Sequence, residues 1–245
     1  MIEPAFTASK LGLSQIVLAI GALGTASYGV VDVTKGFGGG VSNRGFGDIK
    51  KVIAKFLPAG PSAKGSTSAL ALPSVLSTLR ANWLNGMALG DQKSIAKALI
   101  KLNLTRSNAT VMAMAAGVDE TVLASVAEKI AKGAPLTPAE TTKPLLTPAE
   151  TDVYGRFDLV LTAQLDEGYQ RGDQRYRNSA KLLAVPIAVL LALLGTWSMA
   201  GTNLNSGDIW RAVLGGLLAT PLAPVAKDLA SAIQAGAKAA QSLKG

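Results

Sequence analysis

The chain has 245 residues, of which 49% are hydrophobic and only 16% are charged, and its formal net charge at pH 7 is +8. It contains no cysteine and no histidine, which excludes disulfides, thiolate and imidazole metal ligands, cysteine nucleophiles and Ser-His-Asp triads. This composition favours a membrane protein, and for such a protein the positive charge points to anionic lipid rather than to nucleic acid.

The first predicted element is a transmembrane helix within residues 1–32. No charged residue interrupts the stretch 11–31, and about 20 apolar residues cross the hydrocarbon layer of a bilayer. A cleaved signal peptide is the alternative, but the length of the stretch and the preceding Glu3 favour a retained anchor. Residues at the spacing of helix–helix contacts are Gly21, Thr25, Ala22 and Ala26.

Residues 33–147 are predicted to form a cytoplasmic helical domain with Gly/Pro-rich linkers, one of them between Leu57 and Pro73. The domain opens with a glycine-rich run. A dinucleotide-binding loop would need a preceding strand, whereas this run follows a transmembrane helix. We interpret it as an exit from the membrane, in which Lys35 and Arg44 contact lipid headgroups.

Two helices are expected inside this domain. Residues 91–102 place Ile95, Leu99 and Leu102 along one face. Residues 119–132 begin with acidic residues and end with lysines, which matches the helix dipole. A separate face of the first helix carries Lys93, Lys97 and Lys101.

The motif Leu-Thr-Pro-Ala-Glu occurs twice, at 136–140 and 146–150. Each copy is typical of a helix start, with threonine as the N-cap, proline at the first helical position and glutamate completing a capping box. The second copy opens a predicted stalk helix, residues 148–181, which enters the next span and with it covers about 50 residues, or ~75 Å. Such a helix can bend at Gly168, Gly172 or Pro186. Acidic residues followed by arginine at i+4 predict a solvated, salt-bridged surface along it.

Residues 182–226 are predicted to form two transmembrane helices, and residues 227–245 an amphipathic cytoplasmic helix. The first is the strongest hydrophobic segment of the chain. The second is short and contains Pro221 and Pro224, so a kinked span is expected, with a re-entrant segment as the alternative. Small residues at contact spacing in this helix are Gly215, Ala219 and Ala223, and flanking candidates for lipid headgroup contact are Lys181 and Lys227.

The cations cluster after the first span, before the second and after the third. The positive-inside bias therefore predicts that the middle region and the C-terminus face the cytoplasm, with the N-terminus and the loop near residues 203–208 outside. The expected fold is an all-α integral membrane protein with about three transmembrane helices, a helical cytoplasmic domain and a long stalk helix entering the second span.

Two short patterns lie in the last third of the chain. Asp166, Arg171, Tyr176 and Arg177 stand at the spacing of Phe-Asp-x-x-Met-Asp-Arg followed by tyrosine and a cation, and 223–228 matches Ala-Pro-x-x-x-Asp. Both patterns resemble an uncharacterised family of bacterial inner-membrane proteins with an N-terminal span, a helical cytoplasmic region and a C-terminal pair of spans. The resemblance implies this topology and a bacterial inner membrane, and it lends no activity. The four matching residues are the candidate functional residues of the stalk, either as a binding site or as its salt-bridged surface. The chain departs from the family pattern at Leu165, Tyr169 and Gln170.

The predicted function is that of a non-enzymatic, self-associating scaffold or assembly subunit with a cytoplasmic docking domain. No catalytic, cofactor-binding or metal-binding residues are predicted. The expected partners are a bilayer with anionic lipids and either further copies of the chain or another membrane protein, without nucleic acid. An oligomeric channel is the alternative, and a lipid-acting membrane enzyme has less support. Polar residues that could line a channel are Ser14, Gln15, Thr25 and Ser27.

Overall fold

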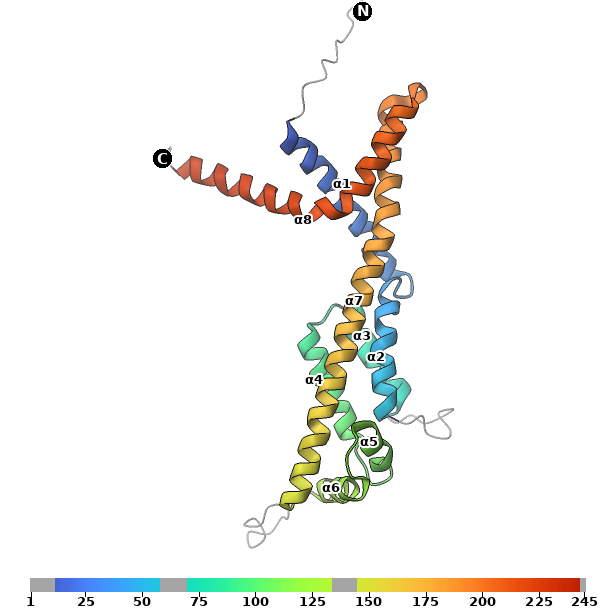
Figure 1. Ribbon diagram of the computed structural model, residues 1–245, viewed down its shortest axis with the longest axis vertical. Coiled ribbons are helices and arrows are strands. Elements are labelled where there is room, and N and C mark those ends of the chain that lie inside the picture. The colour runs from blue at the N-terminus through green and yellow to red at the C-terminus, as the bar shows by residue number, and fades with distance from the viewer. Residues whose placement is uncertain (1–11, 58–69, 134–144, 243–245) are drawn as a thin grey trace, which may run out of the picture. The chain divides into compact units, whose positions relative to one another are not determined.

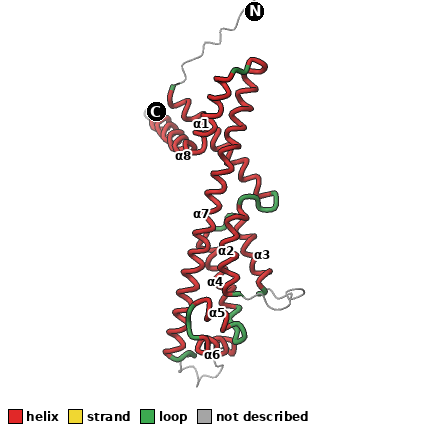
Figure 2. Tube along the Cα trace, turned by 45° about the vertical axis from the view of Figure 1, so that its right-hand side comes forward, coloured by secondary structure: helices red, strands yellow, loops and turns green. Residues whose placement is uncertain are grey.

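The computed structural model describes residues 12–57, 70–133 and 145–242, and every structural statement below concerns these residues. The structure is 86% helical, and no strand occurs in its described part (Figure 2). The predicted all-α fold is therefore confirmed. Two compact units are present: a membrane unit, Met1–Val41 with Arg177–Gly245, and a helical unit, Ser42–Tyr176.

Three helices of the described chain are long and apolar enough to cross a membrane, which indicates a multi-pass membrane protein. They are α1 (Leu13–Val33), α7 (Pro148–Ala200) and α8 (Ser206–Ser242) (Figure 1). The short 3-10 helices η1 (Thr34–Gly36) and η2 (Gly201–Asn203) follow α1 and α7. The long helix that was predicted to run from a stalk into the second span is present as α7.

Helix α8 extends further than the sequence suggested. It runs without interruption through the expected third span and through the expected separate amphipathic helix. Pro221 and Pro224 lie inside it. Each proline removes one backbone hydrogen bond, but its φ is that of a helix, so a helix can bend there without ending. Figure 1 shows α8 changing direction between its first half and its C-terminal half.

In its described residues, the helical unit consists of five helices and the first part of α7. Helix α5 stops at Gly117, whose φ of 66° is left-handed and favours glycine. Three residues later α6 begins, capped by Asp119, whose carboxylate accepts a hydrogen bond of 2.9 Å from the Val122 amide. The five helices are α2 (Ser42–Phe56), α3 (Leu72–Leu84), α4 (Leu89–Leu102), α5 (Ala109–Ala116) and α6 (Glu120–Lys132).

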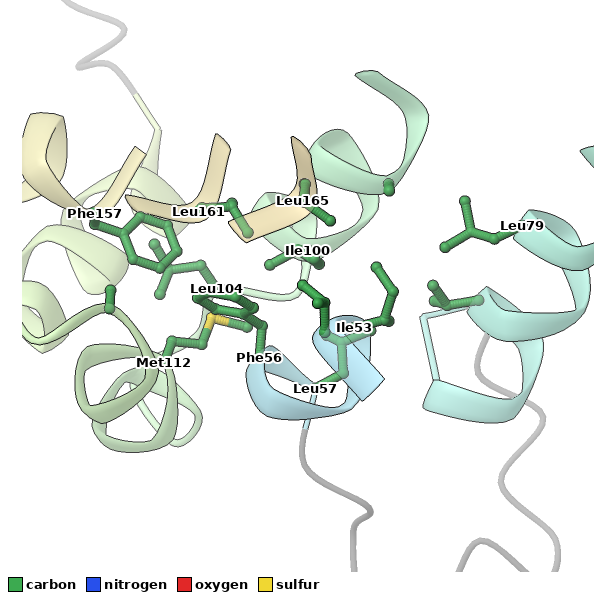
Figure 3. Close-up of a cluster of buried hydrophobic side chains, with 14 of the residues drawn as sticks. Ile53, Phe56, Leu57, Leu79, Ile100, Leu104, Met112, Phe157, Leu161 and Leu165 are labelled. Carbon is green, nitrogen blue, oxygen red and sulfur yellow. The ribbon is translucent and has the colours of Figure 1, made fainter. Parts of the chain in front are cut away.

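Large apolar side chains from these helices and from α7 meet in one core (Figure 3). Phe56 of α2 lies edge-on to Phe157 of α7, with 6.3 Å between ring centroids. Each fully buried side chain of this size contributes about 1.5–3 kcal/mol. The α7 side of the core consists of Phe157, Leu161, Leu165 and Tyr169.

Both helices expected in the middle region are confirmed as α4 and α6, but the buried face of α4 differs from the prediction. Ala96 and Ile100 are fully buried, whereas Leu102 is 66% exposed. The buried stripe lies between the predicted apolar face and the row of lysines, because those lysines contact α7 instead of facing solvent. The first Leu-Thr-Pro-Ala-Glu copy and most of the predicted 57–73 linker lie outside the described residues.

Candidate functional site

Helices α2 and α7 cross in direct backbone contact inside the helical unit. A Cβ added to Gly45 would lie 2.5 Å from the Gly172 carbonyl oxygen, and one added to Gly172 would lie 2.8 Å from that of Gly45. One helical turn earlier in α7, a Cβ on Gly168 would lie 2.8 Å from Val52 Cγ2. Gly168 and Gly172 therefore allow close approach of α2, a role the sequence analysis did not assign to them. We call these three glycines the glycine crossing.

An indole from α3 covers one side of the glycine crossing. The Trp83 Nε1–H donates a hydrogen bond of 3.0 Å to the Ser42 carbonyl at the start of α2. Its ring stands edge-on to Tyr176, with 6.2 Å between centroids. A Cβ on Gly45 would also lie 2.8 Å from Trp83 Cζ2. Helices α2, α3 and α7 thus converge at Gly45, because a residue without a side chain leaves room for Trp83 and for the backbone of α7.

A buried carboxylate lies one turn from Gly45 on α2. The Asp48 side chain is 7% exposed, and Arg175 Nε lies 3.1 Å from its Oδ2. Lys51 Nζ lies 3.8 Å from Oδ1. A lone buried carboxylate is costly, so Arg175, itself half exposed, is what makes Asp48 tolerable at this position. Asp48 was not among the predicted site residues, although the sequence shows a single acidic residue four positions before the apolar Val52, on the same helix face.

A second set of ion pairs joins α4 to α7. Lys93 pairs with Asp166, while Lys97 and Lys101 lie 2.6 and 3.1 Å from the two carboxylate oxygens of Asp158. Burial alone raises the pKa of Asp158, but the hydrogen bonds from Lys97 and Lys101 outweigh it and hold that pKa below its ordinary value. We call these five residues the α4–α7 ion ladder. It replaces the solvated surface that was expected at these acids.

The start of α7 is tied to α6 through Glu150. The Thr147 amide donates to Glu150 Oε2 at 2.8 Å and the Glu150 amide donates to Thr147 Oγ1 at 3.3 Å, so the predicted capping box is confirmed. Ser125 Oγ and Lys129 Nζ of α6 also donate to this carboxylate, each at 2.7 Å. The hydrogen bond from Lys129 and that from the Thr147 amide lower the pKa of Glu150 to about 2.

The four stalk residues singled out by the family resemblance have different surroundings. Asp166 belongs to the α4–α7 ion ladder, and Tyr176 packs against Trp83. Arg171 is exposed and pairs with Glu167 at 2.5 Å within α7, and Arg177 is exposed. These four side chains do not converge on one site. Two positions that depart from the family pattern, Leu165 and Tyr169, are buried in the core.

Helix packing in the membrane unit uses part of the predicted set of small residues. A Cβ on Gly21 would lie 1.9 Å from Ala226 Cβ, and one on Gly24 would lie 2.1 Å from the Ala219 carbonyl oxygen and 3.0 Å from Ala223 Cβ. Gly21, Ala219 and Ala223 are thus at the α1–α8 contact, which also includes the unpredicted Gly24. Of the other candidates, Ala22, Thr25 and Ala26 are exposed, and a Cβ on Gly215 would meet nothing within 4 Å.

The predicted lipid headgroup contacts remain accessible to different degrees. Lys35 pairs with Asp32 at the end of α1 and is partly exposed. The other three candidates, Arg44, Lys181 and Lys227, are exposed. Exposed cations next to apolar helices are suited to anionic headgroups.

The pair α5–α6 has the outline of a helix-turn-helix, with a left-handed glycine in a three-residue turn. Its second helix begins with Asp119 and Glu120, and Ser125 and Lys129 on the same helix bind Glu150. The start of α6 is therefore acidic, and two of its side chains serve the packing of α6 against the start of α7.

Among the described residues, no group of three or more histidine, cysteine or acidic side chains is placed to hold a metal ion. The most distinctive arrangement is therefore the glycine crossing with its buried Asp48–Arg175 pair. Comparisons of the chain with known protein families, with curated proteins and with solved structures found no match.

Proposed function

We propose that this protein is a non-enzymatic subunit of a membrane assembly that self-associates in the bilayer and uses its helical unit as a cytoplasmic docking domain. One observation carries the proposal: α7 belongs to both units. Its first part supplies Phe157 and Leu161 to the core of the helical unit, and its last part is apolar enough to span a bilayer. One helix thus joins a membrane anchor to a folded domain.

The glycine crossing supports a structural role for the helical unit. It joins α2, the first helix after the α1 region, to the part of α7 that precedes the membrane unit. Asp48 and Arg175 link these two segments by charge. An assembly subunit needs such a fixed arrangement of helices, because a docking surface must be preorganised to bind without a large entropic cost.

We place the membrane unit in a bacterial inner membrane with the helical unit in the cytoplasm. The support is the charge distribution, because Arg44, Arg175, Arg177 and Lys181 lie where the chain passes between the two units. The family resemblance agrees with this orientation. The close α1–α8 contact at Gly21 supports α1 as a retained span rather than a cleaved signal peptide.

A channel has less support than a scaffold. Two hydroxyls that could line a path are used within α1: Thr25 Oγ1 donates to the Gly21 carbonyl at 3.1 Å, and Ser27 Oγ donates to the Gly24 carbonyl at 2.7 Å. Ser27 is also fully buried in the helix packing. Hydroxyls that satisfy their own backbone are typical of helix packing in membranes.

Native mass spectrometry of the detergent- or nanodisc-extracted chain tests the proposal. We expect a discrete homo-oligomer, together with the absence of ion flux when the protein is reconstituted in liposomes. A monomer under all extraction conditions would contradict self-association. Flux that scales with the amount of oligomer would instead establish the channel.

A further inference from the structure

Helix α8 changes character along its length. No charge occurs between Arg211 and Lys227, and the exposed side chains ahead of its prolines include Leu217 and Leu218. This first part suits lipid wherever it does not contact another helix. After Ala226, none of the described side chains of α8 is buried, and lysine, serine and glutamine stand among the alanines. The two parts of one helix are therefore suited to different surroundings.

The part of α8 after Ala226 has a polar face and an apolar face. At about 100° per residue, Leu229 and Ile233 lie on one side of the helix, and Ile233 is 50% exposed. In water such an apolar face would stay uncovered. Four exposed polar side chains share the other side: Lys227, Ser231, Gln234 and Lys238.

This part of α8 also leaves the direction of the span. Pro221 and Pro224 each remove one backbone hydrogen bond, which permits a bend just before the first charge. Figures 1 and 2 both show the C-terminal half of α8 turning away from the last part of α7, which belongs to the same unit. A helix that continues from a span and turns aside where the charges begin stays next to the bilayer from which it emerges.

The charge of this segment matches one kind of membrane surface. Residues 227–245 contain three lysines and one aspartate. Lys227 and Lys238 lie at the centre of the polar face, whereas Asp228 lies at its edge. In a helix at the membrane surface, lysines attract anionic headgroups while the apolar face enters the boundary of the acyl chains.

We propose that the segment of α8 from Lys227 to Lys238 lies on the bilayer surface and binds anionic lipid. Leu229 and Ile233 enter the boundary between headgroups and acyl chains, and the two lysines bind lipid phosphates. This surface binding requires neither self-association nor the proposed topology, and so goes beyond the proposed function. It requires only that the first part of α8 crosses the bilayer, for which the helix is long and apolar enough.

A matched pair of reporter positions tests this orientation, because the chain contains no cysteine of its own. Ser231→Cys and Ile233→Cys lie two residues apart on different faces, and both side chains are exposed in the chain alone. Each full-length variant carries a fluorophore and is reconstituted in vesicles of phosphatidylcholine and phosphatidylglycerol with nitroxide-labelled lipid. We expect Ile233→Cys to lose most of its fluorescence to the nitroxide and Ser231→Cys to keep most of its own.

Two further variants supply the controls. Leu218→Cys reports insertion, because Leu218 is exposed in the first part of α8, and the nitroxide should quench it in every vesicle. Lys238→Gln, combined with Ile233→Cys, measures the charge. With phosphatidylglycerol present, it should lower the ratio of bound to free helix by about fivefold, the contribution of one lysine at an anionic surface. In phosphatidylcholine alone it should have no effect.

The outcomes separate surface binding from its alternatives. Weak quenching of both reporters would place the segment in water, and strong quenching of both would place it inside the bilayer; either result overturns the proposal. If neither the nitroxide nor aqueous iodide quenches Ile233→Cys, protein such as a second copy covers the apolar face instead. Binding that is unchanged without phosphatidylglycerol would overturn the recognition of anionic lipid. An unquenched Leu218→Cys would overturn the span itself, and with it the proposed membrane subunit.

Discussion

At the scale of single residues, Gly45 and Gly47 of α2 form a natural comparison. A Cβ on Gly45 would collide with the Gly172 carbonyl and with Trp83, whereas a Cβ on Gly47 would meet nothing within 4 Å. We expect Gly45→Ala to lower the free energy of unfolding by about 1–3 kcal/mol, because α2 must move away from α7. Gly47→Ala should raise it by about 0.5–1 kcal/mol, because alanine favours a helix.

Thermal unfolding of the two variants, followed by far-ultraviolet circular dichroism, measures this difference. The two substitutions are chemically identical and lie in the same helix, so local helix propensity cancels between them. Equal effects would mean that the glycine crossing contributes nothing to stability.

The low pKa of Glu150 predicts that the free energy of unfolding depends on pH in the acidic range. Its pKa is about 2 in the folded chain, against an ordinary value of 4.5, because Lys129 and the Thr147 amide bind the charged form. A folded-state pKa below the unfolded one adds stability that is complete above about pH 4.5 and disappears as the pH falls towards 2. The variant Glu150→Gln should therefore be less stable at pH 7 and should lose less stability than the parent protein between pH 5 and pH 2.

Unfolding midpoints measured in steps from pH 7 to pH 2 check the Glu150 prediction. If the unfolding midpoints of the parent protein and of Glu150→Gln fall equally with decreasing pH, the hydrogen bonds from α6 to this carboxylate do not stabilise the fold. The related Glu167→Gln serves as the control, because Glu167 is exposed and pairs only within α7.

Glu150 and Asp48 also show which residues a sequence can reveal. The Thr147–Glu150 capping box is local, so its spacing alone was sufficient to predict it. Asp48 depends on Arg175, which is far away in the chain and is brought close by the crossing of α2 and α7. The Gly45–Gly172 contact is likewise tertiary. The sequence suggested Gly172 only as a possible bend of the stalk helix, and it placed Gly45 in the glycine-rich exit from the membrane, whereas the structure places Gly45 in helix α2.

At the scale of helices, the α4–α7 ion ladder explains why the buried face of α4 differs from the predicted one. Its lysines align with two aspartates of α7, which turns Ala96 and Ile100 inward. We expect Asp158→Asn to lower the free energy of unfolding by about 1 kcal/mol, since one partly buried carboxylate serves two lysines. Glu167→Gln, which breaks an exposed pair, should cost less than about 0.5 kcal/mol.

Chemical denaturation at low and at high salt distinguishes these two pairs. Salt screens exposed charges more strongly than partly buried ones. The cost of Asp158→Asn should therefore persist in high salt, and the small cost of Glu167→Gln should vanish. If Asp158→Asn no longer lowers the free energy of unfolding in high salt, the α4–α7 ion ladder does not fix the position of α4.

The α1–α8 contact gives a second prediction at this scale. Gly21→Leu would drive a side chain into Ala226, whereas Gly29→Leu projects into open space, because a Cβ on Gly29 meets nothing within 4 Å. We expect Gly21→Leu to separate α1 from α8 and to lower the thermal midpoint in detergent. Gly29→Leu should leave the midpoint within the error of the measurement. If both variants behave alike, α1 does not pack through Gly21.

The sequence was sufficient to predict which segments form helices, but not which residues of each helix contact other helices. Apolar length defines the three candidate spans, and the 3.6-residue period defines α4 and α6. The uninterrupted course of α8 was missed because the predicted span ended before the first following charge, Lys227, and the amphipathic segment after it was taken as a separate helix. Which of several small residues in a span meets another helix depends on the neighbour, so Gly24 was missed while the exposed Ala22 and Ala26 were chosen.

At the scale of the whole molecule, the organisation of the chain follows from two kinds of burial. The helical unit buries large side chains such as Phe56 and Phe157 in a water-excluded core. The membrane unit leaves Leu190, Leu194 and Trp197 exposed and packs through glycine and alanine instead. Lipid is as apolar as leucine, so large side chains gain nothing by leaving it, and close backbone contact holds the spans together.

The proposed topology makes the final prediction, and the absence of native cysteine makes it measurable. Lys132 lies at the exposed end of α6 and Asn203 lies exposed between α7 and α8. If the helical unit is cytoplasmic, Lys132→Cys in intact bacterial cells should react with a membrane-impermeant maleimide only after permeabilisation. Asn203→Cys should react before it, because an odd number of spans separates the two positions. The reverse pattern would invert the topology and place the cations outside, against the positive-inside bias; equal labelling of both would mean that α7 does not cross the bilayer.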